Sequence, residues 1–218
     1  MKKYLKLQKR EEKGFTLIEI LLSMTISLIG FSASATLILL GHQQFFSGQN
    51  VTRIQQQARI ALGKMVEELQ ETTIGTINPD TSSIDSENPS NIISFASARD
   101  DNSAFVLNEE RTPDWSHVII YFRDADSNIL YRYREVKTNW EENYNVSEFN
   151  SSEISDKEPM ATSVTGVEFW VSDNLLNIKL KIVIDPKAQS LSGEEFLNAI
   201  ESGEIKEEEL ITAIGIRN

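Results

Sequence analysis

A single carboxylate, that of Glu19, lies inside the most apolar stretch of this sequence. Between residues 15 and 40 it is the only ionisable side chain, and it is the fifth residue of the stretch. A carboxylate within a membrane-spanning helix costs at least ~2–3 kcal/mol, so such a residue is a functional candidate by default. The alternative is a glutamate near the helix start that reaches the membrane interface and benefits from the positive end of the helix dipole.

A second group of oxygen ligands, Asp124, Asp126, Asn128 and Glu135, has the spacing of a calcium-binding loop. In such a loop the sixth position is a glycine that permits a sharp turn, and here it is Ile129. Predicted strands rather than helices flank the segment, so a hairpin turn explains these residues better than a metal site. Calcium is the one cofactor that the sequence suggests, through these four residues.

No residue pattern for catalysis accompanies these groups. His42 and His117 are 117 − 42 = 75 positions apart, with no further metal-ligand pattern around them. The sequence contains no cysteine, no phosphate loop and no dinucleotide-binding glycine cluster. We therefore expect a protein that is not an enzyme.

Charge is distributed unevenly along the chain. Residues 1–14 hold six basic and two acidic side chains, a net charge of 6 − 2 = +4, while the remainder holds 21 − 6 = 15 basic and 33 − 2 = 31 acidic side chains, a net charge of −16. So acidic a remainder argues against direct binding to nucleic acid. By the positive-inside rule, the basic segment places the N-terminus in the cytoplasm and the rest of the chain outside.

The apolar stretch is long enough to cross a membrane. As a helix, the 26 residues from 15 to 40 would span roughly 39 Å, which exceeds the ~30 Å hydrocarbon core. The stretch also continues past the small residues 32–35, which resemble a signal-peptidase site, so we expect it to be retained. The sequence predicts a single-pass protein of the cytoplasmic membrane with residues 15–41 as its transmembrane segment.

The stretch KGFTLIE at residues 13–19 resembles the type III signal of type IV prepilins, in which a short basic leader ends in glycine and a glutamate is the fifth mature residue. The resemblance implies that a prepilin peptidase cuts after Gly14, removing residues 1–14, and methylates the new amine on Phe15. It also implies that Glu19 neutralises the N-terminal amine of a neighbouring subunit, which gives the costly charge a partner. One departure is that no proline occurs between residues 15 and 77, whereas many pilins have one in this helix.

Shorter segments are similar to one branch of this family. Residues 57–62, QARIAL, and residues 67–69, EEL, are similar to the helix of PilW-type minor pilins and J-type minor pseudopilins. The hairpin ending at residues 130–132 and the terminal residues 216–218 are similar to those proteins too. The implied partners are prepilin peptidase, other pilin or pseudopilin subunits and an inner-membrane assembly platform.

Hydrophobic periodicity predicts an amphipathic helix over residues 42–77 that packs one face on a sheet. The residues of that face are Val51, Ile54, Ala58, Ala61, Met65 and Leu69. Residues 78–218 are predicted to form a β-rich head, with residues 137–162 as a long loop and an acidic helical segment inserted at about 190–210. Strands are expected over residues 92–97, 104–107, 117–123, 129–135, 164–171, 176–184 and 211–217.

The expected fold class is α+β and pilin-like, a long N-terminal helix packed on an antiparallel β-sheet head. The expected function is a structural subunit, more narrowly a minor one, of a type IV pilus or a related pseudopilus, with priming or capping of the filament as a candidate role. One alternative is a membrane-tethered binding or adhesin head that uses the prepilin export route. Another is a minor pseudopilin of a type II secretion system.

Overall fold

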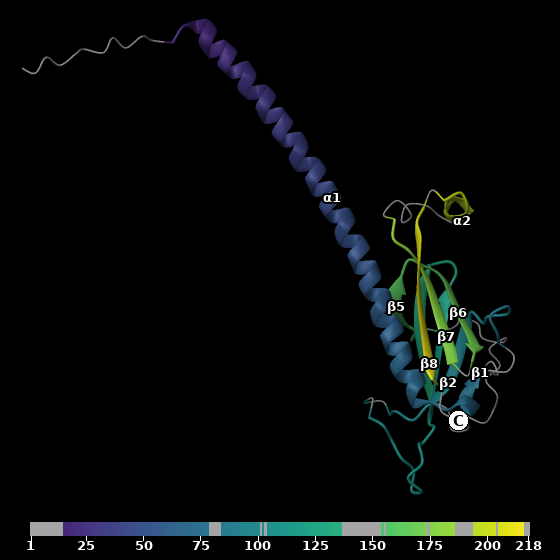
Figure 1. Cartoon of the computed structure of the whole chain (residues 1–218). Helices are drawn as coiled ribbons and strands as arrows, with labels where there is room; N and C mark the ends of the chain where they lie inside the picture. Colours follow the sequence, from purple (N-terminus) through teal and green to yellow (C-terminus); the bar gives the residue numbers. More distant parts are fainter. Residues whose placement is uncertain are drawn as a thin grey trace, which may run out of the picture. The chain divides into compact units, whose positions relative to one another are not determined.

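The computed structural model of the chain describes residues 15–78, 84–100, 102, 104–136, 154, 156–173, 175–185, 194–203 and 205–215 (Figure 1). The chain divides into two compact units, one up to Ser47 and one from Gly48 onward. The first unit contains the N-terminal part of helix α1 (Leu17–Glu71), and the second contains the rest of α1 and the β-rich head. The predicted α+β fold class is confirmed.

Helix α1 continues without interruption for 55 residues, because no proline occurs within it to remove a backbone donor. It ends at Glu71. The next residue, Thr72, is buried and donates its hydroxyl to the carbonyl of Ala96 at 3.1 Å. A short 3-10 turn over Ile74–Thr76 follows and leads into the first strand. The segment that follows the helix is therefore bonded to the head from Thr72 onward.

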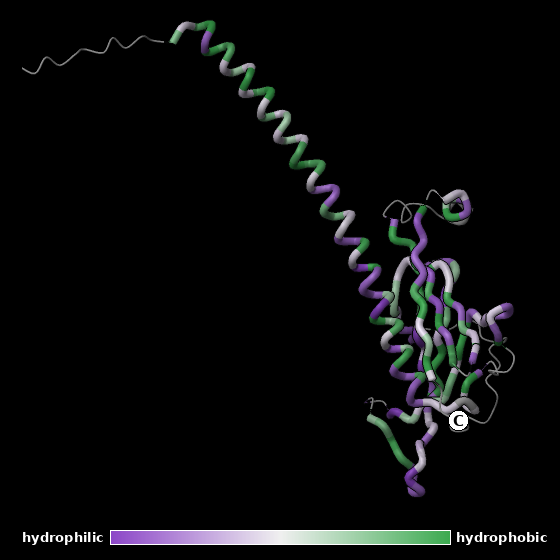
Figure 2. The backbone as a smooth tube through the Cα atoms, viewed as in Figure 1, coloured by the Kyte–Doolittle hydropathy of each residue, from purple (hydrophilic) through white to green (hydrophobic). Residues whose placement is uncertain are grey.

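The two parts of α1 differ in how their side chains are distributed. In the first unit the helix is apolar on nearly all sides, and its large hydrophobic side chains are exposed (Figure 2). In the second unit polar and apolar residues alternate at helical spacing, and one face is buried. The buried positions confirm the predicted stripe for Ile54, Ala58, Ala61, Met65 and Leu69, whereas Val51 is half-buried.

The head contains two antiparallel sheets. The larger sheet has five strands in chain order: β1 (Ile77–Asn78), β2 (Ile92–Ser97), β3 (His117–Asp124), β4 (Ile129–Val136) and β5 (Glu158–Thr162). The smaller sheet has three, also in chain order: β6 (Val164–Ser172), β7 (Leu175–Val183) and β8 (Glu207–Gly215). Since consecutive strands within each sheet are hydrogen-bonded neighbours, neither sheet contains a crossover connection.

One hydrophobic core joins α1 to both sheets. Its largest fully buried side chains include Met65 from the helix, Tyr121 from β3 and Phe169 from β6. In β7 the residues Leu176, Ile178, Leu180 and Ile182 are all buried at alternate positions. That alternation is the pattern of a strand with one face on the core.

Ion pairs connect α1 to the head. The Glu68 carboxylate accepts a hydrogen bond of 2.6 Å from the Tyr121 hydroxyl and pairs with Arg132 at 2.8 Å. Both charged side chains are nearly buried, with 10% exposure for Glu68 and 13% for Arg132. One turn further along the helix, Glu71 forms a bidentate pair with Arg99. The helix is thus held by charge as well as by apolar contact.

The structure differs from the sequence-based expectation in three segments of the head. Residues 104–107 form no strand; they make isolated bridges, Arg99 with Phe105 and Leu107 with Pro113. Strand β5 lies at the end of the segment predicted as a loop. Strand β8 begins at Glu207, four residues before the predicted start. Helix α2 (Glu194–Glu201) is the described helical part of the acidic segment predicted at about 190–210. The last residues of that segment, from Glu207 onward, belong to β8 and not to a helix.

The early start of β8 has an electrostatic cause. Glu209 lies opposite Lys181 in the ladder and forms an ion pair of 3.1 Å with Lys179 on β7. Cross-strand pairs of opposite charge stabilise a sheet, which allows an acidic segment to be a strand. Helix α2 covers the end of this ladder, because its Ala199 packs with Val183 and Ile205.

Candidate functional site

The start of α1 is closed by two residues that bond to each other. The Thr16 amide and the Thr16 hydroxyl both donate to Oε2 of Glu19, each at 3.1 Å. In return, the Glu19 amide donates to Oγ1 of Thr16 at 3.3 Å. This reciprocal arrangement is a capping box, in which two backbone donors that the helix cannot satisfy are bonded by side chains.

The capping box defines the surroundings of the predicted processing site. Phe15 precedes the helix and its side chain is 81% exposed. Gly14, after which cleavage is predicted, lies outside the described residues. The Glu19 carboxylate is therefore bonded to the residue that follows Phe15 in the chain. Cleavage at the predicted bond would create a positive amine next to a carboxylate that already has a partner within the helix.

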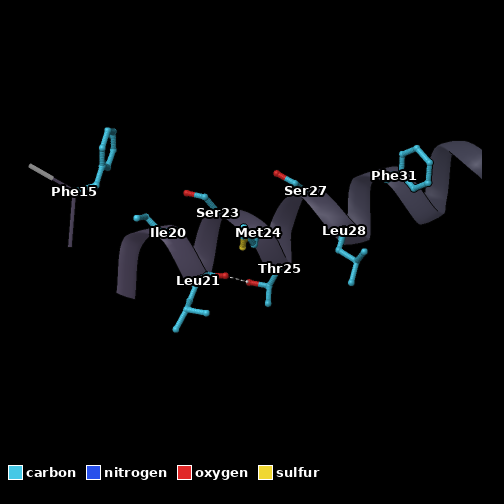
Figure 3. A pocket seen from close by; sticks show the side chains of 9 residues that line it. All are labelled: Phe15, Ile20, Leu21, Ser23, Met24, Thr25, Ser27, Leu28 and Phe31. Carbon is cyan, nitrogen blue, oxygen red and sulfur yellow. Dashed lines mark hydrogen bonds between the residues drawn. The ribbon is translucent and has the colours of Figure 1, made fainter. Parts of the chain in front are cut away.

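The first turns of α1 carry a mainly apolar surface with few free polar groups. Figure 3 shows the residues that line a shallow hollow along these turns, with Phe15 at one end and Phe31 at the other. The hydroxyl of Thr25 donates to the carbonyls of Leu21 and Leu22, at 3.1 and 2.8 Å. Further along, the hydroxyls of Ser34 and Thr36 bond to carbonyls four residues back, at 2.9 and 3.0 Å.

These internal bonds suit a helix in a lipid environment, where a polar group without a partner costs several kcal/mol. Helix α1 contains a window whose mean hydropathy, 1.8, and length are sufficient for a membrane span. None of that window is buried inside the protein, so its apolar surface needs a lipid or protein environment. The segment fits membrane anchoring.

The four candidate calcium ligands do not form one cluster. Asp124 and Asn128 flank the turn between β3 and β4, and Asp126 lies within it. Glu135 lies opposite Val118, six residues along β4 from the turn, which is a separation of roughly 20 Å at ~3.3 Å per residue. In the described part of the chain no group of three or more acidic or histidine side chains could hold a metal ion.

The turn itself accounts for the polar residues in it. Asp124 accepts hydrogen bonds from the Asp126 amide at 3.2 Å and from the Ser127 hydroxyl at 2.9 Å. Desolvation alone would raise the pKa of Asp124, but these bonds, together with Lys157, hold that pKa below its usual value. Asn128 has a positive φ of 53°, a conformation that asparagine adopts more readily than most residues. The predicted hairpin turn is confirmed.

An apolar, unburied helix that continues into the core of an antiparallel head defines an α+β, pilin-like architecture. Residues 9–35 match the family model of the prokaryotic N-terminal methylation motif, so the chain carries a type IV prepilin signal. No curated protein and no solved structure matches the chain. The signal implies processing by prepilin peptidase and assembly with other pilins.

Sequence reasoning identified Glu19 but missed its bonds to Thr16. The sequence does contain a pattern that predicts these bonds, because TLIE at residues 16–19 has the S/T-x-x-E pattern of a capping box. The pair of Glu68 with Arg132 was also missed. Its members are 132 − 68 = 64 positions apart in the sequence, and no local pattern connects them.

Proposed function

We propose that this protein is a minor structural subunit of a type IV pilus or a related pseudopilus, which enters the filament through its N-terminal helix. The observation that carries the proposal is the prepilin signal at residues 9–35, which includes the start of helix α1, together with the apolar window of that helix, which has no burial inside the protein. Such a helix needs a partner surface once it leaves the lipid. The same two features favour a structural rather than a catalytic role.

The assembly route begins at the membrane. The basic leader stays in the cytoplasm and the acidic head lies outside, as the positive-inside rule requires. Prepilin peptidase cuts between Gly14 and Phe15 and the new amine is methylated. An inner-membrane assembly platform then moves the helix from the lipid into a bundle of other pilin helices. The mature chain has a net charge of 15 − 31 = −16, which does not suit direct contact with nucleic acid.

Glu19 has two successive partners in this proposal. In the membrane its carboxylate is bonded to Thr16 within the same helix, which lowers the cost of burying the charge. In the filament it neutralises the N-terminal amine of an adjacent subunit. An ammonium left without a partner in apolar surroundings costs ~3–5 kcal/mol, more than the ~2–3 kcal/mol by which removal of the carboxylate eases insertion.

The test compares cleavage in membranes with incorporation into filaments, using cells that also supply wild-type partner subunits. We expect Glu19→Ala to be inserted and cleaved normally but excluded from sheared filaments, and Glu19→Asp to be intermediate because its reach is shorter. Thr16→Val is the matched control: it removes the hydroxyl of the capping box but keeps the charge, so it should still enter. Incorporation of Glu19→Ala at the wild-type level would contradict the proposal and favour a membrane-tethered binding head.

A further inference from the structure

The edges of the two sheets differ in how well they are protected. Strand β1 has only two residues, and β5 contains Pro159 and is tied to α1 by the pair of Glu158 with Lys64. The edge of β6 that faces away from β7 is paired with another segment, because Phe169 and Ser90 exchange backbone hydrogen bonds of 2.7 and 2.8 Å. Strand β8 has nine residues and, among the described residues, pairs only with β7.

The pairing of β8 with β7 shows which residues of β8 use their backbone groups to bond to β7 and which do not. The Ile184 amide bonds to the carbonyl of Lys206 at 3.4 Å, and bonding to a neighbouring strand alternates along an antiparallel pair. The even-numbered residues from 208 to 214 therefore bond to β7. The odd-numbered residues direct their amides and carbonyls to the open side: Glu207, Glu209, Ile211, Ala213 and Gly215.

These five residues are all exposed. Gly215 has no side chain, so its exposed surface is backbone. Exposed edge strands are normally blunted by proline, by a bulge or by charge, because their free backbone groups pair with other chains. Strand β8 has no proline, and its register with β7 has no shift. Its charges are confined to residues 207–209, and residues 210–215 have none.

We propose that the open edge of β8 binds an extended strand from another subunit of the filament. In this pairing a basic residue of the partner strand lies opposite Glu207 and an apolar residue lies opposite Ile211, which is 60% exposed. Backbone hydrogen bonds supply affinity and the two side-chain positions supply specificity. A second copy of this chain is disfavoured as the partner by its charge of 15 − 31 = −16 after cleavage. The inference rests on the proposed function.

Two variants of the full chain test the edge in cells that make the filament. Ala213→Pro removes one amide that faces the open side and leaves the bonds to β7 intact. Proline is compatible with an edge strand at such a position, because the missing N–H is not part of the existing ladder. Ile211→Lys places a charge on the edge. Ala213→Pro removes one backbone hydrogen bond to the partner strand, and Ile211→Lys removes an apolar side-chain contact. We therefore expect each variant to enter filaments about twofold less than wild type, or lower still. Leu107→Lys, at a site of 52% exposure elsewhere in the head, should enter as wild type.

The fold of each variant is checked by limited proteolysis of the head in intact membranes. The partner is identified with the variant Ala213→Cys, whose thiol is unique because the natural chain has no cysteine. Labelled with a photoreactive maleimide, it should form an adduct with an extended segment of another filament subunit. An adduct with the same chain, or normal entry of both edge variants beside normal wild-type entry, would overturn the inference. Absence of the wild-type chain from filaments would contradict the proposed function itself.

Discussion

Breaking the buried pair of Glu68 with Arg132 should destabilise the head far more than breaking one of the exposed pairs. Among the described residues, replacing Glu68 by leucine leaves the Arg132 guanidinium with only the exposed Glu158 as a charged partner, at 3.3 Å, and leaves the Tyr121 hydroxyl without its acceptor. Breaking one member of a buried pair costs ~3–5 kcal/mol. Since Glu158 remains, we take about 3 kcal/mol, which corresponds to a fall in Tm of roughly 6–12 °C for a domain of this size.

The double variant Glu68→Leu with Arg132→Met should be more stable than Glu68→Leu alone, because no unpaired charge is then buried. We expect a coupling energy of at least ~1.5 kcal/mol in the double-mutant cycle. Lys64→Met, which breaks an exposed pair with Glu158, is the control and should cost less than ~1 kcal/mol. Additive single effects, or a loss under ~1 kcal/mol for Glu68→Leu, would refute the reasoning.

Intrinsic fluorescence gives a direct assay for this cycle. The three tryptophans, at positions 115, 140 and 170, all follow the membrane segment in the sequence. Denaturant unfolding of the full chain in detergent therefore reports on the head, with no tryptophan signal from residues 15–41. A common slope against denaturant concentration across the variants is required before their free energies of unfolding are compared.

Three further predictions concern processing, the domain boundary and pH. N-terminal sequencing of the membrane-extracted protein should begin with methylated Phe15, and a start at Met1 would contradict cleavage after Gly14. The chain from residue 43 onward should be soluble and monomeric by light scattering, because its helix is amphipathic there; aggregation at neutral pH would argue against the boundary. Despite desolvation, which raises it, the pKa of Glu168 is lowered by Lys181 and Lys179, so Glu168 should stabilise the head above about pH 4.5 and lose that effect as pH falls below it. Glu168→Gln should flatten this acid loss in unfolding titrations.

Local patterns made the helix and most strands predictable. The alternation from Leu176 to Ile182 identified β7 because one face of that strand is on the core, and the KGFTLIE stretch identified the N-terminal site because its residues are consecutive. The start of β8 was placed too late, because an acidic segment is typical of an exposed helix. What makes Glu209 suitable for a strand is Lys179 on β7, and that contact exists only once the ladder has formed.

At residues 104–107 a strand was predicted and none is present. Their short apolar run, AFVL, predicts a strand, yet the side chains of Phe105 and Leu107 are about half exposed. They lie in a small extension in which Asp100 and Asn108 each bond to amides two and four residues ahead. Such Asx turns stop a ladder from growing, and a short apolar run alone does not show whether its side chains meet the core.

The unbroken helix α1 has a mechanical consequence. Because the same helix contains a window long and apolar enough to span a membrane and contributes Ile54 to Leu69 to the core, tension applied along the helix reaches the core of the head through backbone hydrogen bonds. Sliding the helix out of the head would break the contacts of its buried face and the ion pairs of Glu68 and Glu71 at the same time. The head therefore resists tension as a shear joint, in which all contacts share the load, and not as a zipper that opens one contact at a time.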